Sequence, residues 1–342
     1  MKIALLCDHS LDPRLRKRVR WLINSGHEVT IFTDSSRGQH FANAEFKEND
    51  IHHLKLKEAK SFDCFYISGA KVIIRKLLLL SQLKIYNKDM IYEIPDLPLR
   101  SKINFVNHFN LTIFSILVRV LFSRVVVTSN SFIKYLPSNK NYYLCENLPS
   151  DIGFSDDLSA PKRDDKLIRF GFVGALRYPD QMLMLIRYCT ENGHKADFFG
   201  GPEENIEKLK SICVKAGVKI KDNINFHGSF EQCQLEIIYR NIDFVFSVYD
   251  ANQPNVQLAL PNKLYESQLF ETPIIVAKNT YLSEVVNELE IGFSVDALNY
   301  STFSRDMDIG YQKEYEISKD NVIKGIEQAE NNFILWFEEV KL

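Results

Sequence analysis

Predicted buried strands alternate with amphipathic helices in both halves of the chain, and this pattern restricts the fold more than any other feature. Residues 2–7 (KIALLC) predict a buried strand, and the apolar residues of 14–24 recur at helical spacing. Gly26 is placed to end that helix, and residues 27–33 (HEVTIFT) predict a second strand. A strand, a helix and a strand in so short a space form a βαβ unit, which builds a parallel sheet.

The same alternation starts again after a polar segment, residues 150–166, which we interpret as a linker. Strands are predicted at 167–173, 196–199, 224–228, 243–249 and 292–295, with helices at 182–190, 203–216, 235–241 and 321–340. We therefore predict an α/β protein with two Rossmann-like domains, residues 1–149 and 167–324, and a ligand cleft between them. The terminal helix, about 325–342, is a candidate to pack back on the first domain.

Several functional classes are disfavoured by what the sequence lacks. The loop at residues 8–13 (DHSLDP) has no G-x-G-x-x-G pattern, so no dinucleotide cofactor is predicted there. The six cysteines form no C-x-x-C pair, which argues against a disulfide framework or a zinc site and indicates a reducing compartment. We see no signal peptide and no uncharged run near the roughly 20 residues that span a bilayer, so we expect a cytoplasmic protein. Residues 111–122 come nearest to such a run, but Arg119 interrupts it, and we interpret them as a core helix rather than a membrane insertion.

The two halves of the chain carry opposite net charge. Residues 1–150 contain 22 Lys and Arg against 13 Asp and Glu, a net +9, so the rest of the 42 basic and 44 acidic residues gives −11. Such an asymmetry fits a first half that faces a membrane surface, a lipid phosphate or nucleic acid. Uneven decoration of a solvated surface is the alternative interpretation. The basic residues expected to face a lipid surface are Arg14 to Arg20, with Lys71, Arg75 and Lys76.

Residues 255–277 (NVQLALPNKLYESQLFETPIIVA) carry the most specific local signal. Pro261 suits the first position of a helix, and Lys263 and Glu266 then fall three residues apart on one face. A helix N-terminus that carries a lysine suits a phosphate or pyrophosphate, and a glutamate one turn deeper could accept two hydrogen bonds from a ribose diol. A surface ion pair within a helix is the alternative interpretation of the two side chains.

Four polar residues of the first half are candidates for a second ligand. Glu93 and Asp96 follow a predicted strand, where open α/β sheets bind ligands. Asp12 and Arg14 precede the first helix, where either a helix cap or an acceptor contact would explain them. For each of these four residues, the sequence supports a structural role about as well as a functional one.

In its overall motif order, the chain resembles the GT-B glycosyltransferases, specifically the large retaining family 4 of bacterial polysaccharide and glycolipid assembly. The matching segments are Asp12-Pro-Arg14, 26–29 (GHEV), 127–129 (VTS), 172–177 (FVGALR), 199–202 (FGGP), 226–228 (FHG), 261–266 (PNKLYE) and 272–276 (TPIIV). The resemblance covers nearly the whole chain, and residues 36–90 match least well.

This resemblance implies a nucleotide-diphosphate sugar held mainly by the second domain. Arg177 and Lys263 would neutralise the diphosphate and Glu266 would hold the ribose hydroxyls, and these three are the candidate catalytic residues. The remaining donor-site candidates are Gly174, Gly200, Gly201, Asn262 and Leu264. Asp12, Arg14, Glu93 and Asp96 are assigned to the acceptor side. Neither a metal nor a cofactor is expected, because the sugar donor is a co-substrate and no metal-ligand cluster is visible.

The chain departs from the family pattern at three points. The family usually has two glutamates with seven residues between them, but Leu258 stands at the position eight before Glu266. No lysine follows Arg177 closely, since residues 178–181 are YPDQ, and a first-domain histidine near the donor sugar is absent. The nucleotide end of the predicted site is therefore better supported than the sugar end.

The resulting prediction is a retaining glycosyltransferase of capsule, O-antigen or exopolysaccharide assembly. It would move a sugar from a UDP- or GDP-sugar to a saccharide or lipid-linked saccharide, as a cytoplasmic protein on the inner face of the cell membrane, with no nucleic acid partner. A nucleotide-sugar epimerase on the same fold is the first alternative, with Glu93 and Asp96 as acid and base. A non-catalytic polysaccharide-assembly protein is the second, suggested by Leu258.

Overall fold

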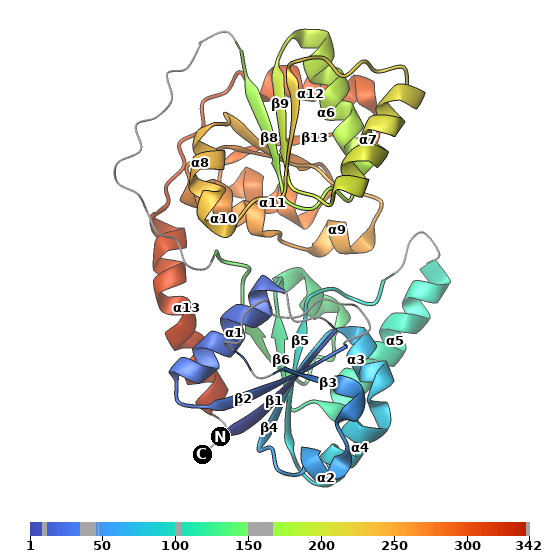
Figure 1. Ribbon diagram of the computed structural model, residues 1–342, viewed down its shortest axis with the longest axis vertical. Coiled ribbons are helices and arrows are strands. Elements are labelled where there is room, and N and C mark those ends of the chain that lie inside the picture. The colour runs from blue at the N-terminus through green and yellow to red at the C-terminus, as the bar shows by residue number, and fades with distance from the viewer. Residues whose placement is uncertain (9–11, 35–45, 47, 100–103, 150–166, 340–342) are drawn as a thin grey trace. The chain divides into compact units, whose positions relative to one another are not determined.

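The computed structural model describes residues 1–8, 12–34, 46, 48–99, 104–149 and 167–339 (Figure 1). The chain divides into two compact units: unit 1 is Met1–Asn147 with Glu327–Leu342, and unit 2 is Leu148–Ile326. The predicted linker, residues 150–166, lies outside the described residues. Each unit is a parallel sheet covered by helices, so the predicted α/β class with two Rossmann-like domains is confirmed.

Unit 1 is built on a seven-stranded sheet of order β3-β2-β1-β4-β5-β6-β7, in which each neighbouring pair is parallel. Its strands are β1 (Lys2–Cys7), β2 (Glu28–Thr33), β3 (Glu48–Asp50), β4 (Cys64–Ser68), β5 (Asp89–Ile94), β6 (Arg124–Val127) and β7 (Asn141–Leu144). Its helices are α1 (Pro13–Asn24), α2 (Leu56–Ala59), α3 (Ala70–Arg75), α4 (Leu77–Ile85), α5 (Asn104–Leu121) and most of α13 (Asp320–Glu338), with 3-10 turns η2 (Ile51–His53) and η3 (Asn130–Tyr135).

Helices α1 and α13 cover one face of this sheet, and α3, α4 and α5 cover the other (Figure 1). The first face is a continuous core in which Leu15 and Val19 of α1 meet Phe333 and Phe337 of α13. Because helices cover both faces, the central strands are buried along most of their length, and all five residues of β4 are buried.

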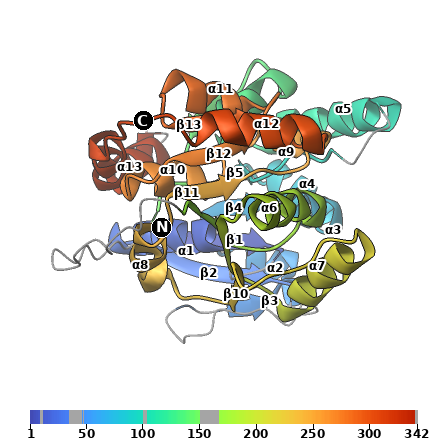
Figure 2. The same cartoon turned by 90° about the horizontal axis from the view of Figure 1, so that it is seen from above.

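Unit 2 is built on a six-stranded sheet of order β10-β9-β8-β11-β12-β13, and its neighbouring strands are also parallel (Figure 2). Its strands are β8 (Arg169–Val173), β9 (Lys195–Phe199), β10 (Ile224–Gly228), β11 (Phe244–Ser247), β12 (Ile274–Ala277) and β13 (Gly292–Val295). Its helices are α6 (Pro179–Asn192), α7 (Glu203–Lys215), α8 (Leu235–Arg240), α9 (Pro254–Leu258), α10 (Asn262–Leu269), α11 (Tyr281–Glu288) and α12 (Tyr300–Gly310), with the 3-10 turn η4 (Gln232–Gln234).

In both sheets the strand order reverses beside the first strand of the unit. The reversal lies between β1 and β4 in unit 1 and between β8 and β11 in unit 2. Loops that leave the carboxyl ends of such strands diverge to opposite faces of the sheet and leave a crevice in which open α/β sheets bind ligands. The residues that follow these four strands are therefore the first place to search for a site.

Some element boundaries differ from the sequence-based predictions. Residues 70–85 form two helices, α3 and α4, because the backbone of Lys76 between them (φ −112°, ψ 18°) is not helical. Arg124 begins β6 and donates to the carbonyl oxygens of Trp336 and Phe337 at 3.1 and 2.8 Å. It thus caps the C-terminus of α13, whose last carbonyls have no partner within the helix. Pro261 precedes α10 as its N-cap rather than occupying its first turn.

Candidate functional site

Two glycine-containing loops meet at the carboxyl edge of the unit 2 sheet. Gly174 follows β8 and Gly200 follows β9, with φ of +124° and +138°. The Gly174 N–H donates to the Phe199 carbonyl at 2.8 Å, and a Cβ on Gly200 would lie 1.9 Å from the Gly174 carbonyl oxygen. A side chain at Gly200 is therefore excluded, and one at Gly201 would approach Ser229 Oγ to 3.1 Å. These loops present backbone, rather than side chains, to the crevice.

Lys263 lies beside these loops in the first turn of α10. Its Nζ donates to the Tyr249 hydroxyl at 2.9 Å and lies 4.8 Å above the centre of the Phe172 ring. A Cβ on Gly174 would lie 3.2 Å from this ammonium group. The Lys263 side chain is buried, so its charge is held in a fixed place at the switch point between β8 and β11.

The N-terminus of α10 adds to this positive end. Its N-cap is Pro261, and no side chain in the described part of the chain caps the helix. Exposed Asn262 occupies the first helical position, while Leu264 is buried in the core. Because the first N–H groups of a helix have no partner within it, this end is suited to an anion such as a phosphate.

Glu266 is buried one turn below Lys263. Its Oε2 accepts a 2.7 Å hydrogen bond from the Tyr239 hydroxyl, and no other hydrogen bond of this carboxylate is found among the described residues. Burial raises the pKa of Glu266, while the Tyr239 hydrogen bond and the Lys263 charge act in the opposite direction. The geometry leaves one carboxylate oxygen available to a ligand hydroxyl.

Arg177 is exposed in the loop that follows β8, and it makes no hydrogen bond or ion pair with any described residue. The next residue, Tyr178, packs its ring 5.2 Å from that of Tyr249, the residue that holds Lys263. The Arg177 loop and the α10 N-terminus are thus linked through one aromatic contact. A flexible arginine here is able to reach an anion bound at the helix end.

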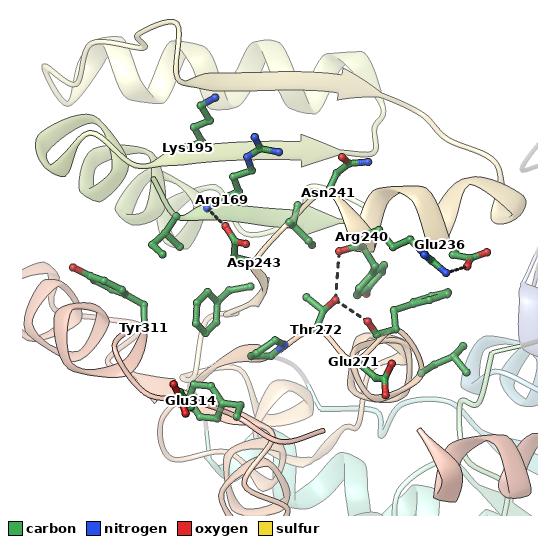
Figure 3. A pocket seen from close by; sticks show the side chains of 18 of the residues that line it. Arg169, Lys195, Glu236, Arg240, Asn241, Asp243, Glu271, Thr272, Tyr311 and Glu314 are labelled. Atoms are coloured by element: carbon green, nitrogen blue, oxygen red, sulfur yellow. Dashed lines mark hydrogen bonds and ion pairs between the residues drawn. The ribbon is translucent and has the colours of Figure 1, made fainter. Parts of the chain in front are cut away.

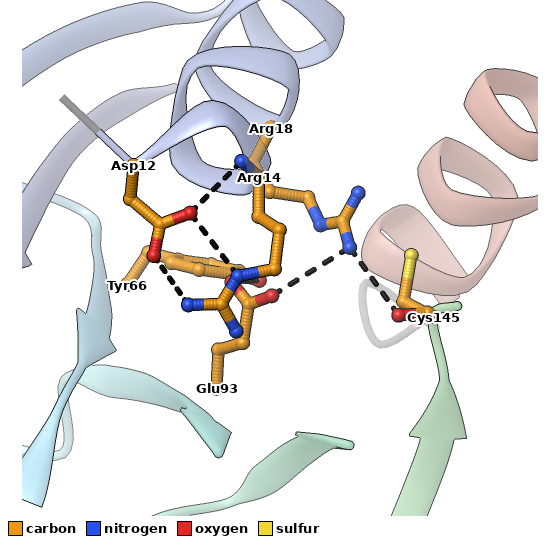
Figure 4. Close-up of polar contacts among 6 residues, drawn as sticks. All are labelled: Asp12, Arg14, Arg18, Tyr66, Glu93 and Cys145. Carbon is orange, nitrogen blue, oxygen red and sulfur yellow. Dashed lines mark hydrogen bonds and ion pairs between the residues drawn. The ribbon is translucent and has the colours of Figure 1, made fainter. Parts of the chain in front are cut away.

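In unit 1 the acceptor-side candidates Asp12, Arg14 and Glu93 lie near one another (Figure 4), and Asp96 follows β5 two residues after its end. Asp12 is the N-cap of α1, and its Oδ1 accepts from the backbone N–H and the Nε of Arg14 at 3.0 and 3.1 Å. Burial lowers the pKa of Arg14, but Asp12, Glu93 and Asp96 act in the opposite direction, and the pKa is raised overall. Arg14 therefore remains charged among three carboxylates. Exposed Asp96 is the one whose side chain faces solvent.

Glu93, in contrast, lies inside unit 1 with no exposed side-chain surface. It accepts a 2.8 Å hydrogen bond from the Tyr66 hydroxyl and lies 3.6 Å from Nη2 of Arg18 (Figure 4). Arg18 is itself fully buried and stacks over the rings of Trp21 and Phe333 at 4.8 and 5.4 Å. The Glu93–Arg18 pair thus joins α1, β5 and α13.

This burial corrects the expected basic docking surface on the first helix. Arg18 has no exposed surface and Lys17 is buried against the Trp21 ring, so neither contributes to a solvated basic face. Burial and the charge of Arg18 lower the pKa of Lys17 to about 8. The helical spacing of these residues was read correctly, but the return of α13 onto α1 covers that side.

Four residues near these sites were not singled out from the sequence. Tyr239 and Tyr249 hold Glu266 and Lys263, and they come from α8 and from the loop after β11. Asp8 follows β1, and its buried Oδ1 has no hydrogen-bond partner within the described part of the chain. Gly69, with φ +97°, follows β4 at the same switch point, and a Cβ there would lie 3.1 Å from Asp8 Oδ2. The position of Asp8 directly after a predicted strand was the available signal.

A cavity of about 760 Å³ lies at the other, amino-terminal edge of the unit 2 sheet (Figure 3). Arg169, Lys195 and Asp243 line it at the beginnings of their strands. Two ion pairs lie among its lining residues, Arg240 with Glu236 at 2.6 Å and Lys319 with Glu271 at 3.6 Å. The glycine loops, Lys263 and Glu266 do not line it, although Tyr239, which donates to Glu266, does.

Searches for two other kinds of site concern the described residues alone. Within them, no group of three or more His, Cys, Asp or Glu is arranged to hold a metal ion. No helix in the same ranges is both long and apolar enough to cross a bilayer.

The chain was also compared with known proteins. No protein-family model matches it, and no curated protein sequence matches it.

Solved structures do match along the whole length. A sucrose-phosphate synthase from Thermosynechococcus elongatus has a TM-score of 0.68 and 11% identity, covering 99% of both chains. HepE from Anabaena, solved with UDP and glucose, has a TM-score of 0.68 and 16% identity over 99% of this chain and 100% of its own. A glycosyltransferase from Rickettsia africae has a TM-score of 0.67 and 12% identity over 99% of this chain and 98% of its own. The chain therefore has the two-domain GT-B fold that these solved proteins share.

Proposed function

We propose that this protein is a glycosyltransferase that moves a sugar from a nucleotide-diphosphate donor, a UDP- or GDP-sugar, to a saccharide or lipid-linked saccharide. The observation that carries the proposal is the pair of buried charges on one turn of α10. Lys263 is held by Tyr249 beside the switch point of unit 2, and Glu266, one turn deeper in α10, is held by Tyr239. A cation beside a helix N-terminus with a carboxylate one turn away matches a diphosphate joined to a ribose.

The donor site follows from this pairing. The diphosphate lies over the Gly174, Gly200 and Gly201 loops and the N-terminus of α10 at Asn262, between Lys263 and Arg177. As the bond from the anomeric carbon to the diphosphate breaks, negative charge develops on the leaving oxygen, and these fixed cations stabilise it. Glu266 accepts from the ribose hydroxyls. The bound UDP in the HepE structure supports a nucleotide in this fold. Leu264 contributes to the core, not to ligand contact.

The acceptor occupies the carboxyl edge of the unit 1 sheet in this proposal. Asp8, Asp12, Arg14 and Asp96 offer it hydrogen bonds, while buried Glu93 supports the site from within. The reaction proceeds with retention, without metal or cofactor, in capsule, O-antigen or exopolysaccharide assembly at the cytoplasmic side of the membrane. The order of motifs along the chain is what supports these finer points.

Donor binding is the decisive experiment. A ligand that binds only the folded state at 100 times its Kd stabilises that state by about 2.7 kcal/mol. We expect UDP- or GDP-sugars to raise the melting temperature of the wild type and of Glu288→Gln, an exposed control in α11. We expect no such rise for Glu266→Gln. If no UDP- or GDP-sugar binds the wild type, the proposal fails.

Two alternatives make different predictions in the same preparation. An epimerase would convert the donor with no acceptor present, whereas a transferase would at most hydrolyse it slowly. The burial of Glu93 against Arg18 does not favour the epimerase, because Glu93 was needed as an acid or base.

A non-catalytic assembly protein would bind the donor but would transfer its sugar to no extracted acceptor. Leu258 suggests this alternative, because it is buried where a glutamate was expected.

A further inference from the structure

Helix α5 leaves an apolar stripe uncovered on unit 1. Phe114, Val118 and Leu121 form its buried side. The exposed apolar side chains recur at helical spacing on the other side: Phe105 (81% exposed), Phe109, Ile113, Ile116 and Val120. This corrects the interpretation of residues 111–122 as a core helix, since only one side of the helix enters the core.

The neighbouring helices of the same layer continue this surface. Helix α4 contacts α5, and both cover the face of the sheet opposite to α1 (Figure 1). Ile74 of α3 and Leu78 and Ile85 of α4 are exposed, Leu78 to 84%. We call these three residues and the α5 stripe together the α4–α5 face. Soluble proteins rarely expose a large apolar surface unless it contacts a partner or a membrane.

The two chain segments that carry the α4–α5 face contain charges of one sign. Residues 70–88 contain five Lys or Arg and residues 97–145 contain six, and neither segment contains Asp or Glu. Lys84 and Arg119 are exposed and make no ion pair with any described residue. Burial lowers the pKa of Lys140, and the charges of Lys84 and Arg119 lower it further. Basic segments of this kind are complementary to an anionic surface.

We propose that the α4–α5 face docks on a bilayer surface that contains anionic phospholipid. The apolar stripe enters the boundary between headgroups and acyl chains, and Lys84 and Arg119 contact lipid phosphates. A lipid surface accounts for both features at once, because it offers apolar depth and spread-out negative charge. The biological use of this docking rests on the proposed function, because docking would bring a lipid-linked acceptor to unit 1. Vesicle binding itself needs neither donor nor acceptor.

Vesicle co-sedimentation of the purified full chain tests this inference. We expect binding to vesicles of phosphatidylcholine with phosphatidylglycerol, weaker binding to phosphatidylcholine alone, and release as salt rises. The double variant Phe109→Asp/Ile116→Asp should lower the partition at least about tenfold, because it removes apolar contact and adds like charge. The matched control, Val214→Asp/Ile309→Asp, changes two exposed apolar residues of unit 2 and should bind as the wild type does.

A second variant tests the charge separately from the apolar stripe. The variant Lys84→Gln/Arg119→Gln should lose the additional binding to anionic vesicles and retain the weaker binding to phosphatidylcholine alone. The inference is overturned if the wild type ignores anionic vesicles, or if the α5 variant binds them unchanged. It is also overturned if that variant only converts a dimer to a monomer by light scattering, which would identify a second copy of the chain as the partner. Thermal shifts induced by the sugar donor, measured on the same samples, test the proposed function independently. They therefore distinguish a failure of the docking inference from a failure of the proposed function.

Discussion

The hydroxyl of Tyr239 donates a 2.7 Å hydrogen bond to Oε2 of Glu266, and both side chains are buried. Tyr239 comes from α8 and Glu266 from α10, so the bond fixes the carboxylate of one helix from another. The phenol stays protonated, since burial and then Glu266 raise its pKa well above the ordinary value. A hydrogen bond from a fixed donor orients the carboxylate without neutralising it.

The substitution Tyr239→Phe should therefore weaken donor binding. A hydrogen bond to a charged group contributes about 1.5–3 kcal/mol, so we expect the Kd for the nucleotide-sugar to rise about tenfold or more in calorimetry. Tyr281→Phe removes a hydroxyl from α11 that makes no hydrogen bond with the described residues, and it should leave the Kd unchanged. Equal Kd values for the two variants would contradict an orienting role.

Glu266→Gln should stabilise the ligand-free protein at neutral pH. The folded state raises the Glu266 pKa, so it binds the proton more tightly than the unfolded state does. The wild type therefore loses stability as pH rises through that raised pKa, and the variant does not. In urea unfolding between pH 4 and 8, the advantage of the variant should grow with pH. A constant difference would show that burial does not perturb this carboxyl.

Gly200→Ala should destabilise the donor loops by more than the cost of placing an alanine at a positive φ. The added Cβ would meet the Gly174 carbonyl oxygen at 1.9 Å, so the backbone has to move. Gly193→Ala is the matched control, because Gly193 also has positive φ (+76°) but no atom within 4 Å of the new Cβ. We expect the control to lose about 1–2 kcal/mol and Gly200→Ala to lose more, with donor binding abolished. Equal losses in urea unfolding would contradict the close approach.

The buried pair of Arg18 and Glu93 should behave as a unit in a double-mutant cycle. Removing one partner leaves a buried charge uncompensated, at a cost of about 3–5 kcal/mol. Arg18→Met and Glu93→Gln should each lower the free energy of unfolding by about that amount, and the double variant should lose clearly less than their sum. Additive losses would mean that the two charges, 3.6 Å apart, are independently compensated.

Asp8→Asn should reduce transfer while leaving donor binding intact. Its Oδ1 lacks a partner at the β1–β4 switch point, where a sugar hydroxyl could donate to it. We expect a transfer rate several-fold lower with an unchanged donor Kd, because the neutral amide oxygen of Asn accepts a hydrogen bond from a substrate hydroxyl that is weaker by about 1 kcal/mol than one to a carboxylate. Glu58→Gln, an exposed carboxylate of the same unit, is the control and should transfer as the wild type does. Wild-type transfer by Asp8→Asn would exclude the role.

The fold class was predictable because the apolar runs of β1, β8, β11 and β12 are local signals. Lys263 and Glu266 were likewise placed on one helical turn by their spacing alone. What the sequence did not reveal depends on elements far along the chain. Arg124 reads as a helix end until the last turn of α13 supplies its carbonyl partners, more than 200 residues away.

The same limit applies to the sites. Tyr239 and Tyr249 have ordinary surroundings in the sequence, and only the tertiary structure brings them to Glu266 and Lys263. The burial of Arg18 depends on Phe333, so a basic helical face became an internal ion pair. The roles of Arg177, Lys263 and Glu266 in catalysis stay predictions.

The course of α13 has a consequence for how the protein matures on the ribosome. Unit 1 begins with β1, yet its core also contains Phe333, Trp336 and Phe337 of α13, which are synthesised after the whole of unit 2. Unit 2, which is continuous in sequence, is therefore able to complete its core first. The N-terminal unit must wait, with the space beside α1 unfilled, until α13 has been synthesised. Nascent chains that stop before residue 333 should therefore be recognised by chaperones through unit 1, although that unit was made first.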